Sequence, residues 1–114
     1  MKYLCLVYFD ESKLHAAPAS PRDEECLAYD GELRASGTVI ASEALEPVAS
    51  ATTVRVREGR VSVTDGPFAE TKEQLGGFHL IEARDLNEAI GVAAGIPSAR
   101  IGSIEVRPIR QLQA

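Results

Sequence analysis

The stretch that decides the fold runs from Thr64 to Phe78 and reads TDGPFAETKEQLGGF. Its Gly-Pro pair and its paired glycines are ordinary signals for turns and strand boundaries. A turn does not require the ordered acids, the Phe and the Lys that lie between those signals. The stretch therefore carries more information than a loop needs, and it separates two segments with the alternation of β-strands.

The segment before this stretch, residues 54–64, predicts a β-hairpin with a two-residue turn at Glu58-Gly59. The register set by this turn brings four valines together on one face: Val54, Val56, Val61 and Val63. It also places Arg57 opposite Arg60, which is unfavourable unless the two side chains splay into solvent or share an anion.

The rest of the chain alternates strands with helices. Strands are predicted at residues 2–9, 38–44, 77–83 and 101–109. Helices are predicted from Pro21, after a cap at Ser20, to about Ser36, and after a cap at Asp85 up to Gly95. This order predicts an α+β fold of the ferredoxin-like βαββαβ type with an inserted β-hairpin.

Residues 2–9 are apolar on both alternating faces, so both faces of the sheet need cover. Two helices cover only one face. We therefore expect a homodimer formed through the open sheet face, with a cavity enclosed between the two copies.

Composition places the chain in the class of small single-domain proteins, here spanning residues 1–114. A net charge of −5 argues against a nucleic-acid surface, and no segment is apolar enough to cross a membrane. The N-terminus does not resemble a secretion signal, and only two cysteines occur, so we expect a cytoplasmic protein with reduced thiols. With two histidines and no compact ligand spacing, we expect no metal site and no cofactor.

Asp65 is the leading catalytic candidate. Alternation places it on the face of Val61 and Val63, where the strand breaks at Gly66-Pro67. A carboxylate at the end of an apolar face is partly desolvated, which favours use as a general acid or base. The alternative is a turn-initiating Asp that binds backbone amides two residues ahead.

His79 is the second catalytic candidate. It alternates with Ile81 and Ala83, on the face opposite Phe78 and Leu80. A near-neutral pKa would suit it for acid–base work, whereas the alternative is a packing residue of the sheet. His15 is expected to be an exposed loop residue.

Four further residues are candidates for a substrate site. Lys72 could hold an anionic substrate or join Glu70 and Glu73 in a solvated ion-pair cluster. Phe68 is expected to anchor the turn in the core or the dimer seam. Glu105 and Arg107 share the open-face side of the last strand, where they form either a structural ion pair or part of a pocket lining.

The stretch at 64–78 resembles the signature of the DGPF-type, YCII-related family of small bacterial proteins. Further resemblance lies at Lys2-Tyr3-Leu4, at residues 45–47 and 51–63, and at residues 102–109. The resemblance implies a dimeric α+β barrel of unknown function, with an enzymatic role inferred from a polar cleft and with genes often beside those of alternative sigma factors. Related proteins carry a His in the first helix that is proposed to work with an Asp. Cys26 stands at that position here, which puts such a dyad in doubt and favours Cys26 as a small hydrophobe.

Two functions remain open at this point. One is a small cofactor-independent enzyme that acts on a small, anionic molecule in a cleft of the dimer, with Asp65 as acid or base. The other is a non-catalytic module that senses a small ligand or binds a protein such as a sigma factor. The sequence does not decide between an enzyme and a binding module.

Overall fold

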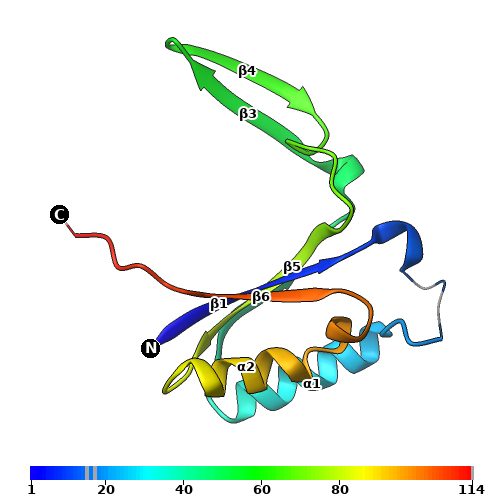
Figure 1. Cartoon of the computed structure of the whole chain (residues 1–114), viewed down its shortest axis with the longest axis vertical. Helices are drawn as coiled ribbons and strands as arrows, with labels where there is room; N and C mark the ends of the chain where they lie inside the picture. Colours follow the sequence, from blue (N-terminus) through cyan, green and yellow to red (C-terminus); the bar gives the residue numbers. More distant parts are fainter. Residues whose placement is uncertain (15, 17, 114) are drawn as a thin grey trace.

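The computed structural model describes residues 1–14, 16 and 18–113, so His15 lies outside the described residues. Four antiparallel strands form one sheet in the order β2-β5-β1-β6. Both helices lie on one face of this sheet, as Figure 1 shows. The arrangement is α+β and compatible with the predicted ferredoxin-like fold. The bounds are β1 Lys2–Phe9, α1 Asp23–Ala35, β2 Val39–Ala44, β5 Gln74–Glu82, α2 Leu86–Gly95 and β6 Ser103–Pro108.

The core lies between the sheet and the two helices. The inward side chains of β1, which are Tyr3, Cys5 and Val7, are at most 5% exposed. They pack with Ile81 of β5 and with apolar residues of α2 and the turn after it, among them Ala89, Ala93 and Ile96. Every second side chain of β1 therefore points toward the helices, as the period of two in a β-strand requires.

Among the described residues, no helix lies over the opposite face of the sheet. The register places Leu4 beside Leu80 and Leu6 beside Phe78 on this side. We call this surface the open face and define it by five partly exposed apolar residues: Leu4, Leu6, Tyr8, Phe78 and Leu80.

The remaining two strands form a separate hairpin. β3 (Thr52–Arg57) and β4 (Arg60–Asp65) pair with each other and with no other strand among the described residues. Val54 pairs with Val63 and Val56 with Val61, in the register predicted from the alternation. The turn residues Glu58 and Gly59 both have positive φ, 52° and 74°, as a two-residue hairpin turn of this type requires.

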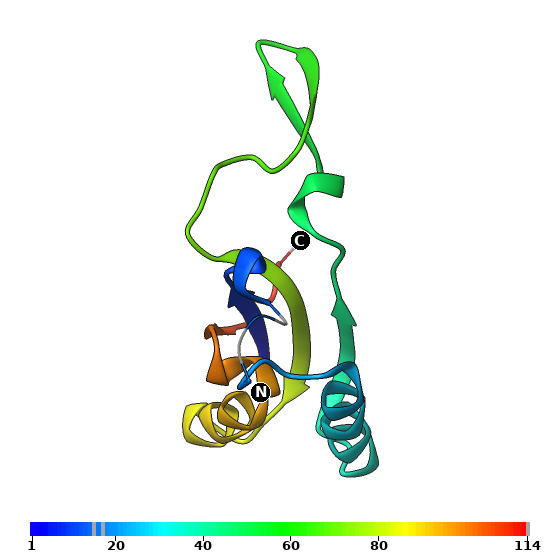
Figure 2. The ribbon, with the colours of Figure 1, turned by 90° about the vertical axis from the view of Figure 1, so that its right-hand side faces the viewer.

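Figures 1 and 2 show this hairpin standing away from the sheet on the side opposite the helices. It is attached through a short 3₁₀-helix at Val48–Ser50 on one side and through residues 66–73 on the other. The Cα radius of gyration is 15.9 Å, whereas a compact chain of this length has about 13 Å. The extended hairpin accounts for this difference.

The two helices differ in how well their starts were predicted. Helix α1 begins at Asp23 after Arg22, not after Ser20, and the carboxylate of Glu25 accepts a hydrogen bond from the Arg22 backbone N–H at 3.4 Å. Helix α2 begins as predicted: Asp85 caps it by accepting from the Glu88 N–H at 2.9 Å. Leu86 and Ile90 of α2 are about half exposed.

Strand β5 begins at Gln74, three residues before the predicted start at Gly77. Its pairing with β1 continues past the two glycines through a β-bulge. The pairing passes from Val7–Gly77 to Tyr8–Leu75, so Gly76 is the extra residue. A Cβ on Gly76 would lie 2.3 Å from the Phe9 ring, and one on Gly77 would lie 2.9 Å from the Glu43 carbonyl oxygen. The glycines therefore permit both a bulge and a close backbone approach. In the part of the chain that the structure describes, no helix is long and apolar enough to cross a membrane.

Candidate functional site

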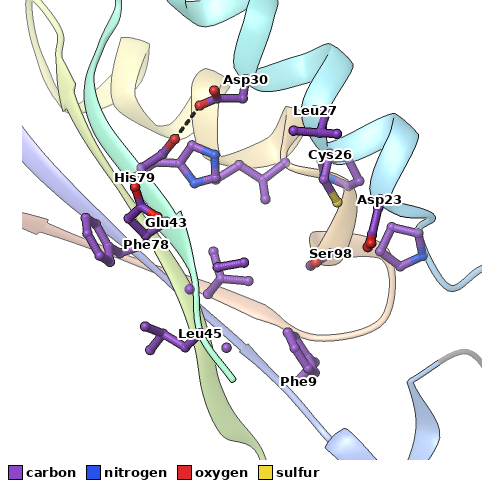
Figure 3. A pocket seen from close by; sticks show the side chains of 18 of the residues that line it. Phe9, Asp23, Cys26, Leu27, Asp30, Glu43, Leu45, Phe78, His79 and Ser98 are labelled. Carbon is purple, nitrogen blue, oxygen red and sulfur yellow. Dashed lines mark hydrogen bonds between the residues drawn. The ribbon is translucent and has the colours of Figure 1, made fainter. Parts of the chain in front are cut away.

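The best-formed cavity lies between α1 and the helix-covered face of the sheet. Its volume is about 410 Å³, within the usual range for small-molecule sites. Apolar groups form most of its wall, among them Val7 and Phe9 of β1, Leu27 of α1, and Ile96 and Pro97 after α2. The bulged glycines of β5 line it as well. Figure 3 shows this pocket and the side chains around it.

His79 is the titratable base of the pocket. Strand β5 places it beside Cys5 of β1 and Ser42 of β2, on the helix-covered side of the sheet. Its Nδ1 atom is buried and has no hydrogen-bond partner among the described residues. Burial lowers the pKa of His79 below its ordinary 6.5, and the nearby Asp30 carboxylate opposes this shift only in part. The imidazole is therefore neutral near pH 7 and retains a free lone pair or N–H.

A polar cluster from α1 and β2 lies next to this imidazole. The Ser42 hydroxyl donates to Asp30, and the Arg34 Nε donates to the same carboxylate at 2.7 Å. The Arg34 Nη2 also donates to the Ser42 hydroxyl oxygen at 3.3 Å. The hydrogen bond from Ser42 and the pairing with Arg34 lower the pKa of Asp30, so this carboxylate is ionised beside His79. The dashed line in Figure 3 marks the bond between Ser42 and Asp30.

Cys26 and Asp23 extend the pocket along α1. Burial, with the negative charges of Asp23 and Glu25, raises the pKa of the Cys26 thiol. The thiol is therefore protonated near neutral pH, and it lacks the thiolate character of a nucleophile. Neither lysine nor arginine lines the described pocket, whereas the carboxylates of Asp23 and Asp30 do. The described residues also contain no group of three or more His, Cys, Asp or Glu side chains arranged for a metal ion.

The structure places the other predicted catalytic residue elsewhere. Asp65 ends β4 opposite Thr52, is exposed, and does not line the pocket. Its carboxylate makes no hydrogen bond or ion pair with any described residue. A backbone hydrogen bond, and not the Asp65 side chain, stabilises the end of the strand: the Gly66 N–H donates to the Ala51 carbonyl at 2.7 Å.

The predicted substrate-binding residues also do not line this pocket. Phe68 is 75% exposed in the single chain, and Lys72 is exposed in the same loop. Arg107 donates through Nε to Glu105 on β6, so these two form the ion pair that was one of the two predicted alternatives. The register places them beside Leu4 and Leu6, on the open face. Of the six predicted site residues, the structure brings only His79 into the pocket.

Sequence reasoning did not identify Asp30, Arg34 or Ser42 as site residues. Asp30 lies four residues after Cys26 and four before Arg34, so one signal was present in the helical spacing. Ser42 carried no such signal, because its meeting with α1 depends on how the helix packs on β2.

A four-stranded antiparallel sheet with two helices on one face and a pocket between the first helix and the sheet defines a class of small α+β domains. The YCII-related domain matches residues 1–113, and the chain belongs to this family. It is also 39% identical over 115 residues to an uncharacterized protein of Rhizobium meliloti (strain 1021), a match that covers 96% of this chain and 92% of the relative. The predicted family is therefore confirmed.

Proposed function

We propose that this protein is a small acid–base enzyme whose catalytic base is His79 in the pocket between α1 and the sheet. The observation that carries the proposal is the buried, unpartnered Nδ1 of His79 at the wall of a 410 Å³ cavity. A buried polar atom without a partner costs free energy, so its retention favours a partner supplied by a ligand.

The proposed chemistry follows from a neutral His79 that lies close to an ionised Asp30. A neutral imidazole accepts a proton from a bound molecule, and the ionised Asp30 nearby stabilises the imidazolium that forms. Arg34 and Ser42 hold Asp30 in place through the hydrogen bonds described above. His79 would thus act as the base and Asp30 as a positioning and charge-stabilising residue.

The pocket favours a neutral or positively charged small molecule with an apolar body. Its two α1 carboxylates, Asp23 and Asp30, repel an anion, and its apolar wall suits a hydrocarbon or aromatic part. The anionic substrate expected from Lys72 and Arg107 would need a different site, because neither residue lines this pocket.

The test compares two variants of the whole protein, His79→Gln and Asp65→Asn, against a panel of small metabolites by ligand-observed NMR and by turnover assays. We expect His79→Gln to abolish turnover and Asp65→Asn to retain it. Turnover that survives His79→Gln but is lost in Asp65→Asn would overturn the proposal and place the chemistry at the signature stretch.

A second candidate function is a non-catalytic binding module, such as a partner of a sigma factor. The exposed valines of the β3–β4 hairpin favour it, because surfaces of this kind mark protein contacts. Stable capture of a purified sigma factor by both His79→Gln and Asp65→Asn would support this candidate.

We further propose that two copies pair through the open face to give the dimeric α+β barrel that the family resemblance implies. Support comes from the apolar residues of that face, which no described element covers. Sedimentation of the intact protein at micromolar concentration tests the pairing, and a monomer would contradict it.

A further inference from the structure

The β3–β4 hairpin, residues 52–65, exposes an apolar face that its own chain does not cover. Its four valines lie together on one side of the strand pair and are 57–67% exposed. An isolated two-stranded hairpin is marginal in water, and apolar cross-strand pairs stabilise it best when something packs on them. The hairpin therefore needs a cover for its valine face.

The other side of the same hairpin carries charge. Arg55, Arg57 and Arg60 lie on the face opposite the valines, and the Arg55 Nη2 donates to the Phe68 carbonyl at 3.5 Å. The hairpin holds three arginines and two acids, whereas the rest of the chain holds nine basic and fifteen acidic residues. The hairpin is thus locally basic on a chain that is acidic elsewhere.

We propose that this hairpin is an arm that crosses to a second copy of the chain and packs its valine face on that copy's open face. This inference rests on the dimer proposed above and adds that the β3–β4 hairpin contributes to its interface. Two uncovered apolar surfaces of the same molecule then cover each other, and a two-fold axis lets each copy give one arm and receive one.

The position of the hairpin favours packing on a second copy over packing on the open face of its own chain. Both views show the hairpin standing off its own sheet, with its base attached beyond the ends of β2 and β5. The receiving face bears Glu43 beside Phe78, while Glu105 beside Leu6 is already paired with Arg107. Because the arginines of the arm lie opposite its valines, apolar contact rather than charge seats the valine face.

The dimensions are compatible with this arrangement. Two six-residue strands cover roughly 20 Å by 10 Å, and a four-stranded face is about 19 Å wide. One arm thus leaves about half of the open face for the partner's sheet. Two arms bury roughly 800 Å² in total, below the ~1,200 Å² of a stable interface, so arm and sheet contacts must act together.

The first experiment compares the oligomeric state of arm variants by sedimentation velocity. The variant Val56→Lys/Val61→Lys places charge on the valine face, and Ser62→Lys/Thr64→Lys places it on the opposite face of the same hairpin. We expect the valine-face variant to raise the dimer dissociation constant by about 100-fold or more and the control to change it little. Both should keep the wild-type circular dichroism of the sheet and helices.

The second experiment locates the arm directly. A nitroxide is attached to the cysteine of a Ser62→Cys/Cys26→Ser variant, in which the exposed Cys26 cannot take the label. This spin-labelled chain is mixed with ¹⁵N-labelled wild type that carries no nitroxide. We expect broadening of partner amides on the open face, at Leu4, Leu6 and Leu80.

The outcomes separate the two proposals. A dimer whose dissociation constant is unchanged by the valine-face variant, or whose broadening falls away from the open face, would overturn the arm while leaving the pairing intact. A monomeric wild type would overturn both and leave the valine face for a different protein.

Discussion

His79 owes its chemistry to where β5 places it. The strand turns its imidazole toward α1, where the ring is partly buried and its buried Nδ1 has no partner among the described residues. The same ring on the other side of the strand would lie beside Phe78 on the open face and would keep its solvation. One step of alternation thus decides whether this histidine is a buried base.

The first prediction concerns pH. Because burial lowers the pKa of folded His79 below 6.5, the unfolded chain takes up this proton first as the pH falls. The contribution of His79 to stability is therefore fully present above pH 6.5 and is lost as the pH falls through the folded pKa. We expect the free energy of unfolding of wild type to drop more than that of His79→Gln between about pH 7 and pH 5.

Urea titrations at several pH values measure this difference, and the histidine Cε1 proton shift of wild type reports the pKa itself. Parallel curves for the two proteins, or a Cε1 titration at or above 6.5, would contradict the burial of this ring.

The second prediction concerns a single added methyl group. A Cβ on the buried Gly77 would lie 2.9 Å from the backbone carbonyl oxygen of Glu43, which cannot rotate away. We expect Gly77→Ala to destabilise the fold by about 1–3 kcal/mol. The control is Gly91→Ala within α2, where no atom lies within 4 Å and alanine should stabilise by about 1 kcal/mol. Thermal unfolding of the two variants checks the opposite signs.

At the scale of elements, the position of α1 sets the shape of the pocket. Only Leu33 of this helix is buried, so few apolar contacts hold it. Polar links take their place: the Tyr29 hydroxyl donates to the Val92 carbonyl of α2 at 2.6 Å, and Arg100 binds Glu25 through both of its terminal nitrogens at 3.0 and 3.2 Å. The pocket thus lies beneath a helix fixed mainly at its two ends and at one tyrosine.

The third prediction tests the tyrosine link. Tyr29→Phe removes the hydrogen bond to Val92 and leaves its buried carbonyl without this donor, which should cost about 1 kcal/mol. Tyr8→Phe is the matched control, since the Tyr8 hydroxyl makes no hydrogen bond with any described residue. Equal stability of the two variants in urea would show that the helix does not depend on this bond.

The predictable part of the fold was the part that alternation and turn chemistry control. The hairpin register followed from Glu58-Gly59 and four valines, and the α2 cap followed from Asp85 and Glu88. The start of α1 was predicted too early, because Arg22 takes the cap position that Ser20 and Pro21 appeared to offer. Local signals compete at a helix start, and tertiary contacts such as Glu25 with Arg100 decide among them.

The site was less predictable than the fold. His79 was identified from its strand position, but Ser42 and Asp30 meet only because α1 packs on β2. Asp65 was chosen by extending the valine face of the hairpin, on the assumption that this face is buried. In the single chain the hairpin stands in solvent, so its valine face is buried only if a partner covers it.

At the scale of the whole molecule, the two surfaces on which the proposals rest lie on opposite sides of the sheet. The pocket lies on the helix-covered side of the sheet, and the open face lies on the other. Of the five residues that define the open face, only Phe78 also lines the pocket. Ligand binding and pairing should therefore respond to different substitutions.

The fourth prediction follows from this separation. Leu6→Lys places a charge in the open face and should convert the dimer into a monomer, because an unpaired buried ammonium is costly. The His79 titration should remain that of wild type, since Leu6 points away from the pocket. A monomer with an altered His79 titration would show that the pocket is completed by the partner.

The signature stretch joins these two surfaces through one continuous backbone. Near its start it contains Asp65, where the arm ends, and near its other end it contains Gly76 and Gly77, which line the pocket of the same chain. If the arm is seated on a neighbour, tension in residues 66–73 acts at both ends at once. Filling one pocket should then change the affinity of the other, and a dimer titrated with its ligand should show a Hill coefficient that differs from one.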